Sequence, residues 1–188
     1  MIYQTLAFVS DQLNAFLQQH FPSDTNRVVV ADVAQSSASL TNGTENKIIV
    51  SLINIERDAT ATRTMPAQLR DSDKIATTNP TLNLNLDVMI ASRFDDHYGD
   101  GLKLLSSVIG FFQARRQFTR QDTPSLPKGL DKLTVEWVDV TNQSAHNMWT
   151  AFGGRYLPSV VYKLRMLRVQ EGWVLDTTPI ITGTEVKG

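Results

Sequence analysis

The segment from residue 142 to residue 169 contains two different hydrophobic periods. Its first part places apolar residues at the i, i+3, i+4, i+7 spacing of one helical face, namely Ala145, Met148, Trp149 and Phe152. Thr141 or Ser144 is available as the N-cap, and Gly153-Gly154 ends the predicted helix because glycine adopts the left-handed conformation that often follows a last turn. After Pro158, Val160, Tyr162, Leu164 and Met166 alternate with Val161, Lys163, Arg165 and Leu167. This period of two predicts a strand with one apolar face.

Three further stretches near the N-terminus have a clear pattern. Apolar residues recur every three or four positions from Leu6 to His20, which predicts an amphipathic helix that ends before Pro22. Residues 27–33 and 47–56 are short and rich in β-branched side chains, so both are predicted strands. Because Asn42-Gly43 favours a tight turn, we expect these strands to form a loosely closed hairpin. In the second strand, the residues expected to face the core are Ile49, Leu52 or Ile53, and Ile55.

The apolar period is lost between Arg57 and Thr81, over a length well beyond the usual connection of roughly four to six residues. This segment is either a solvated excursion or a contact arm that orders on assembly. From Leu82 to Ile90 the alternation is strict, which predicts a strand with one core face and one polar face.

The pattern then predicts a largely buried helix from about Tyr98 to Arg115, because its apolar residues cover more than half of its circumference. The acidic run at residues 95–100 includes His97 and could suggest a metal site, but N-capping and the helix dipole explain it better. Residues 122–129 form a proline-bounded loop, and residues 132–140 alternate as a strand. After Val169 we expect a turn, a brief strand at 173–175, and a tail that pairs with a neighbour or frays.

Composition narrows the class of protein. The chain has 188 residues, a 41% hydrophobic share and a net charge of −1, so one buried core is expected, without a general attraction to nucleic acid. It has no cysteine, which excludes disulfides and thiolate metal sites. The N-terminus lacks the basic start and apolar run of a signal peptide or membrane span, so we expect no membrane insertion. The element order and these properties predict a single α+β domain at 1–175 and an extended tail at 176–188.

Motifs for catalysis are missing from the chain. His20, His97 and His146 lie in predicted helices or helix starts without a nucleophile-elbow sequence. The Gly153-Gly154 pair is not followed by a phosphate-binding glycine pattern. We therefore expect no catalytic residue, no cofactor and no metal, and an unrecognised small-molecule enzyme is the last alternative.

An ordered series of motifs resembles a known family. It begins with IYQTLAFVSDQLNAFL, NIER, PTLNLNLDVMIAS and SVIGFFQ, and continues with Trp149, Gly153-Gly154, Tyr156, Pro158-Ser159, Tyr162 and Arg165. From Ile2 to about Val169, this series resembles the tail-terminator or cap proteins of phage-tail-like contractile injection systems, of the antifeeding-prophage and virulence-cassette type. The resemblance implies a tail-terminator-like fold, with a mixed and mainly antiparallel sheet flanked by helices, and a structural role without catalysis.

In that family, subunits form a six-membered ring at the end of the inner tube distal to the baseplate, fix tube length and anchor the last sheath layer. The resemblance thus implies a second copy, the tube protein and the sheath protein as partners. It places the chain in the bacterial cytoplasm during assembly, as part of a particle that is released or anchored to a membrane. The alternative is an adaptor that joins the tube end to a second cap protein or a membrane anchor.

Contact residues are expected where charge or β-propensity is exposed. The basic candidates in the 57–80 loop and after the second helix are Arg57, Arg63, Arg70, Arg115, Arg116 and Arg120. For the arginines after the helix, interaction with the helix dipole and open carbonyls is the alternative. The candidates on the last long strand and in the tail are Lys163, Arg165, Pro179, Ile180 and Ile181.

Overall fold

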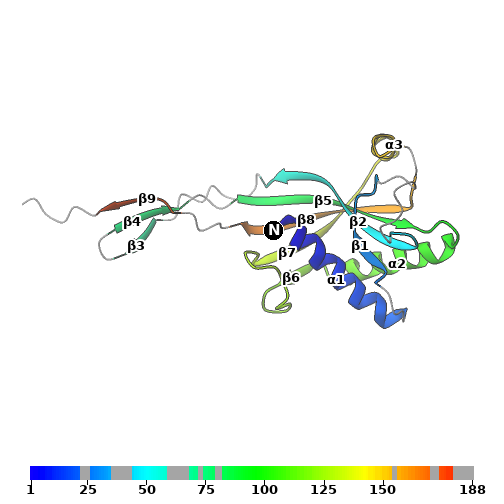
Figure 1. Cartoon of the computed structure of the whole chain (residues 1–188), viewed down its shortest axis with the longest axis horizontal. Coiled ribbons are helices and arrows are strands. Elements are labelled where there is room, and N and C mark those ends of the chain that lie inside the picture. The colour runs from blue at the N-terminus through cyan, green and yellow to red at the C-terminus, as the bar shows by residue number, and fades with distance from the viewer. Residues whose placement is uncertain are drawn as a thin grey trace, which may run out of the picture.

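The computed structural model of the chain describes residues 1–21, 26–34, 44–58, 68–71, 74–78, 82–153, 156–169 and 174–179. Within these ranges it has three helices and nine strands (Figure 1). The helices are α1 (Ile2–His20), α2 (Tyr98–Ala114) and α3 (Asn142–Ala151). The strands are β1 (Val28–Val30), β2 (Lys47–Arg57), β3 (Gln68–Asp71), β4 (Lys74–Thr78), β5 (Leu82–Arg93), β6 (Gln117–Thr119), β7 (Lys132–Val138), β8 (Ser159–Val169) and β9 (Val174–Pro179).

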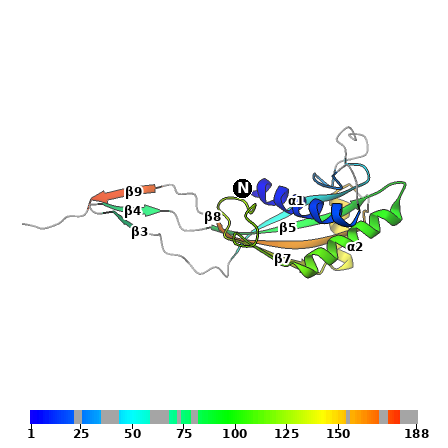
Figure 2. The ribbon, with the colours of Figure 1, turned by 90° about the horizontal axis from the view of Figure 1, so that it is seen from below.

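Six strands form the main sheet in the order β1-β2-β5-β8-β7-β6. Strands β1 and β2 pair in parallel, and the other neighbours in this sheet are antiparallel. Helices α1 and α2 cover one face and α3 lies on the other (Figures 1 and 2). The predicted α+β fold with a mixed, mainly antiparallel sheet flanked by helices is thus confirmed.

The face under α1 and α2 holds the main core. Leu86, Val88 and Ile90 of β5 enter it from the sheet, and Leu13 and Leu17 of α1 pack on them from the helix side. Each of these five side chains has at most 1% of its surface exposed. The predicted alternation of β8 is confirmed, because Tyr162, Leu164 and Met166 are buried in this core while Val161 is buried in a smaller core under α3.

The predicted hairpin between the first two strands is wrong. Val28 pairs with Ile48 and Val30 with Val50 in a parallel ladder. A parallel pair needs a connection of about a dozen residues or more, and residues 31–46 are long enough to provide it. Asn42-Gly43, the expected turn, lies outside the described residues.

The prediction that Ile55 belongs to the core is also wrong, because 47% of its surface is exposed. A β-bulge between Leu52 and Asn54 shifts the register of β2 against β5, and beyond it Ile55 pairs with Leu86. Ile55 therefore lies on the face of the main core, but in the last part of β2, where the residues are exposed. Ile49 is fully buried as expected, whereas Leu52 and Ile53 are half-buried and pack against different cores.

Part of the predicted 57–81 loop forms strands. β3 and β4 pair as antiparallel neighbours, and β4 also pairs with β9, which gives a three-stranded sheet in the order β3-β4-β9. Both views place this small sheet beyond the ends of β5 and β8 (Figures 1 and 2). The tail after residue 173 is therefore a strand as far as Pro179.

The helix after the acidic run begins as predicted, but the capping prediction is wrong. His97 is the N-cap residue of α2, and no side chain makes a capping hydrogen bond there. Asp100 lies in the first turn and pairs with Lys103 at 3.0 Å, which lowers the pKa of the Asp100 carboxyl. The acidic group near the helix N-terminus thus acts through charge and not through a cap.

Helix α3 ends as the glycine pair predicts. Gly153 has φ of +97°, in the left-handed region that a β-carbon disfavours. Its partner Gly154 lies outside the described residues.

We expect Gly101→Ala to destabilise the fold by about 1–3 kcal/mol, because it overpacks the contact between α2 and β5. A β-carbon on Gly101 would lie 2.5 Å from Ser92 Oγ and 2.9 Å from the Phe94 ring. Gly110→Ala is the matched control in the same helix, since no atom lies within 4 Å of its added carbon. The control should gain up to about 1 kcal/mol from helix propensity. Urea denaturation measures the free energy of unfolding of both variants, and equal stability of the two would contradict this packing.

Burial raises the pKa of Tyr162 to about 12 from an ordinary value of 10.0. The unfolded chain therefore ionises at this position before the folded chain does, so its contribution to stability is complete below about pH 10 and is lost as the pH rises towards 12. Tyr162→Phe should flatten this alkaline decline in denaturation curves measured between about pH 8 and 12. An unchanged slope would show that other groups cause the decline.

Candidate functional site

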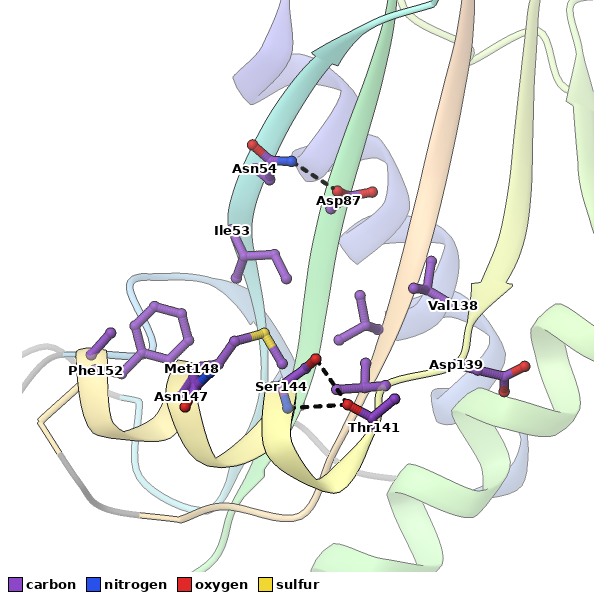
Figure 3. A pocket seen from close by; sticks show the side chains of 13 residues that line it. Ile53, Asn54, Asp87, Val138, Asp139, Thr141, Ser144, Asn147, Met148 and Phe152 are labelled. Atoms are coloured by element: carbon purple, nitrogen blue, oxygen red, sulfur yellow. Dashed lines mark hydrogen bonds between the residues drawn. The ribbon is translucent and has the colours of Figure 1, made fainter.

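A groove lies between α3 and the sheet and has a volume of about 570 Å³ (Figure 3). One wall comes from α3, with Met148 and Phe152 pointing inward, and the floor comes from β2, β7 and β8 through Ile53, Val138 and Val161. Polar side chains form the rim, namely Asn54, Asp87, Asp139, Thr141, Ser144 and Asn147. We call this cavity the α3 groove.

Local sequence explains the position of α3. The Thr141 side chain accepts a hydrogen bond from Ser144 N at 3.2 Å, which confirms Thr141 as the N-cap. Trp149 is 6% exposed and anchors the helix in a small core with Met89, Ala91 and Leu157. Because Trp149 is the one residue of α3 that is buried, the groove beside the helix stays open.

A row of charges continues the same sheet face beyond α3. Lys163 Nζ lies 2.7 Å from Glu56 Oε2 and 3.7 Å from Asp87 Oδ1, and Arg165 Nε lies 2.9 Å from Glu136 Oε2. The hydrogen bond to Glu56 is the main cause that raises the pKa of Lys163, and the charge of Asp87 adds to it. We call these five residues the charge row.

Asp87 joins the charge row to the α3 groove. Its Oδ2 accepts a hydrogen bond from Asn54 Nδ2 at 3.1 Å, but its Oδ1 is buried and has no hydrogen-bond partner among the described residues. The nearest cation to this oxygen is Lys163 Nζ at 3.7 Å, so Asp87 depends on the charge of Lys163.

The two basic residues predicted on β8 are found in this row. Lys163 and Arg165 both pair with acids of the same chain, so they are not free positive charges on the surface. Their paired state leaves the row with three acids and two bases.

The structure separates the three arginines that follow α2. Arg115 stacks over the Phe118 ring at 4.6 Å and donates to the Thr123 hydroxyl, so it is a structural residue. Arg120 donates to the carbonyl oxygens of Pro127 and Leu130, which fixes the loop before β7. Arg116 is exposed and donates to Gln113 at 3.0 Å. These arginines do not form one basic patch.

The remaining predicted contact residues are placed only in part. Arg57 is exposed at the end of β2, Arg70 belongs to β3 and Pro179 ends β9. Arg63, Ile180 and Ile181 lie outside the described residues. Of the residues that carry the family resemblance, Tyr156 is exposed, while Trp149 and Tyr162 are buried. Pro158 O accepts a backbone hydrogen bond from Ser92 N at 2.8 Å.

Sequence reasoning missed Asn54, Asp87 and Glu136 as site residues. Each of the three is a polar residue between apolar neighbours in a strand, as Asp87 is between Leu86 and Val88. The same pattern is typical of a solvated sheet face, and only the register of β5 against β2 and β8 brings the charges together.

Two classes of site are not formed by the residues that the structure describes. In that part of the chain, no group of three His, Asp or Glu side chains is placed to hold a metal ion. None of its helices is long and apolar enough to cross a membrane.

The family model of the Pvc16 N-terminal domain matches residues 8–182 of the chain. Two solved structures share its fold over 96% of its length. One is the PVC sheath/tube terminator of an extracellular contractile injection system in the extended state, with 15% identity and a TM-score of 0.57. The other is the tube-terminating cap of the anti-feeding prophage, with 15% identity and a TM-score of 0.58.

The chain spans only part of these two proteins, 62% of the sheath/tube terminator and 60% of the cap. No curated protein matches it.

Lys163→Met is expected to destabilise the fold by about 1–2 kcal/mol, because Asp87 then keeps a partly buried charge without a nearby cation. Adding Asp87→Asn should recover most of this loss, and the double-mutant cycle measures the coupling. Lys103→Met is the control, since it breaks an ion pair whose side chains are 70% and 60% exposed and should cost at most about 0.5 kcal/mol. Equal effects of the two lysine variants would contradict the role of Asp87.

Proposed function

The chain belongs to the family of the Pvc16 N-terminal domain, and we propose that it is a structural cap of a contractile injection system. In this role it ends the inner tube, anchors the last sheath layer and acts by assembly, without catalysis. The observation that carries the proposal is the similarity of fold, along 96% of the chain, to a sheath/tube terminator and to a tube-terminating cap.

We propose that the functional unit is a ring of copies, with six as the expected number. A closed ring needs two different and complementary surfaces on each copy. The two faces of the main sheet support this arrangement, because one is covered by α1 and α2 and the other leaves the α3 groove and the charge row open. A net charge of −1 also favours association over mutual repulsion of copies.

The proposed partners are a second copy, the tube protein and the sheath protein. The α3 groove and the charge row supply apolar and charged contacts on one surface, as protein interfaces commonly combine them. Neither nucleic acid nor a membrane is a proposed partner. We propose assembly in the bacterial cytoplasm, within a particle that is later released or anchored.

We also propose that residues 1–175 form the terminator domain and that residues 176–188 serve in contacts outside it. Strand β9 crosses this boundary, because it runs from Val174 to Pro179 and pairs with β4. The tail therefore starts as part of the small sheet.

Electron microscopy of particles from a deletion strain tests the cap role. We expect tubes of uncontrolled length or sheaths that detach, because no ring then ends the tube. Complementation with the wild-type chain should restore both features, and the Gly110→Ala chain is a folded control. Normal-length tubes with stable sheaths would refute the cap. Normal particles that lack one attached component would favour the adaptor alternative.

A further inference from the structure

Strand β7 has an open edge at its C-terminal end. Val135 N donates to Arg116 O at 2.8 Å, so the odd-numbered peptides of β7 face β6. β6 pairs only with residues 132–134 of β7. The Trp137 peptide therefore points to the same side beyond β6, where no described strand lies to accept it.

At the two outer edges of the main sheet, β1 and β6, outward-facing backbone groups are occupied by hydrogen bonds from the same chain. At β1, Asn14 Oδ1 accepts hydrogen bonds from Arg27 N and Val28 N, and Asn14 Nδ2 donates to Val28 O, each at 2.9 Å. At β6, Thr123 N donates to Thr119 O at 2.8 Å. Such closure protects sheet edges from pairing with other chains. The edge at Trp137 lacks it.

Two cavities flank this open edge on opposite faces of the sheet. The one beside α2 has a volume of about 280 Å³ and includes Phe112 and Arg116, and the one beside α3 has about 250 Å³ and includes Tyr156. Trp137 belongs to both, and it is 51% exposed while Tyr156 is 67% exposed. A strand added here would place alternate side chains in the two cavities.

The charge at this edge indicates what the added strand carries. Arg116 is exposed in the cavity beside α2, and its hydrogen bond goes to the neutral Gln113. No acidic side chain of the described residues pairs with Arg116. An acid on the incoming strand would complement it, while an apolar neighbour would fill the cavity beside α3.

We propose that β9 of a second copy adds to the open edge of β7. β9 is an edge strand of the small sheet, and its sequence VLDTTP combines apolar residues with one acid, Asp176, and no base. Asp176 is the one acid of this strand, and in the proposed pairing its charge meets that of Arg116.

The donor and the acceptor lie at opposite ends of one chain. Val138 of β7 pairs with Val161 near the start of β8, whereas the small sheet lies beyond the end of β8 (Figures 1 and 2). β9 therefore reaches the edge of another copy and not its own. The contact uses two different surfaces, as a ring requires, and in this respect the inference rests on the proposed function.

A charge swap in the full-length chain tests the pairing. Arg116→Glu should weaken self-association about tenfold in sedimentation velocity, since it places two acids together. Adding Asp176→Arg should restore association to within about threefold of wild type. Lys128→Glu makes the same charge change at another exposed residue and should leave association unchanged. Thermal melting of each variant reports whether the fold is kept.

Photocrosslinking locates the contact independently. With p-benzoylphenylalanine in place of Trp137, cross-links to residues 174–178 of a second copy are expected. The same probe in place of Tyr3, which is 71% exposed on α1, is the control and should not reach them. Links from position 137 to other segments, or an Arg116→Glu chain that assembles like wild type, would overturn the pairing and leave the ring standing. A wild-type chain that stays monomeric at all concentrations would contradict both the strand pairing and the ring.

Discussion

The alternation of side chains along β5 holds both layers of the molecule together. Leu86, Val88 and Ile90 enter the core under α1 and α2, while Met89 and Ala91 enter the core under α3. β5 is also paired on both sides, with β2 and with β8. A one-residue slip of this strand would exchange its two faces and bring apolar side chains to the open surface. The register of β5 therefore fixes the cores and, through Asp87, the charge row.

Only part of the fold and of the site can be predicted from the sequence. Local periods predict α1, α2, α3, β5 and β8, because each period follows from one buried face. The parallel pairing of β1 and the bulge beside Ile53 depend on which strands meet, and no local period contains that information. The α3 groove depends on how far α3 stands from the sheet, so it becomes visible only in the packed structure. The arginines were sensible surface candidates from charge alone, yet their carbonyl and ring partners are distant in sequence.

The coverage of the sheet is unequal, and this inequality shapes the available surfaces. Two long helices close one face, and Asn14 of α1 also closes the β1 edge. On the other face α3 is short and its single buried anchor, Trp149, leaves the groove and the charge row accessible. The α3 groove and the charge row thus lie on the less covered face of the sheet. A chain built in this way has different surfaces to offer to two neighbours in the ring that we propose.

The long strands also determine how the molecule would carry a mechanical load. β5 and β8 run along the longest axis in Figure 1, and their antiparallel ladder extends from Leu82 and Val169 to Ala91 and Ser159. Ladder hydrogen bonds lie perpendicular to the strands. A pull along the axis at the small sheet would act on β5 and β8 together and would load their ladders with β2 and β7 in shear, so that many hydrogen bonds resist at the same time instead of opening one after another. The geometry suits a protein that transmits tension along its length without unfolding.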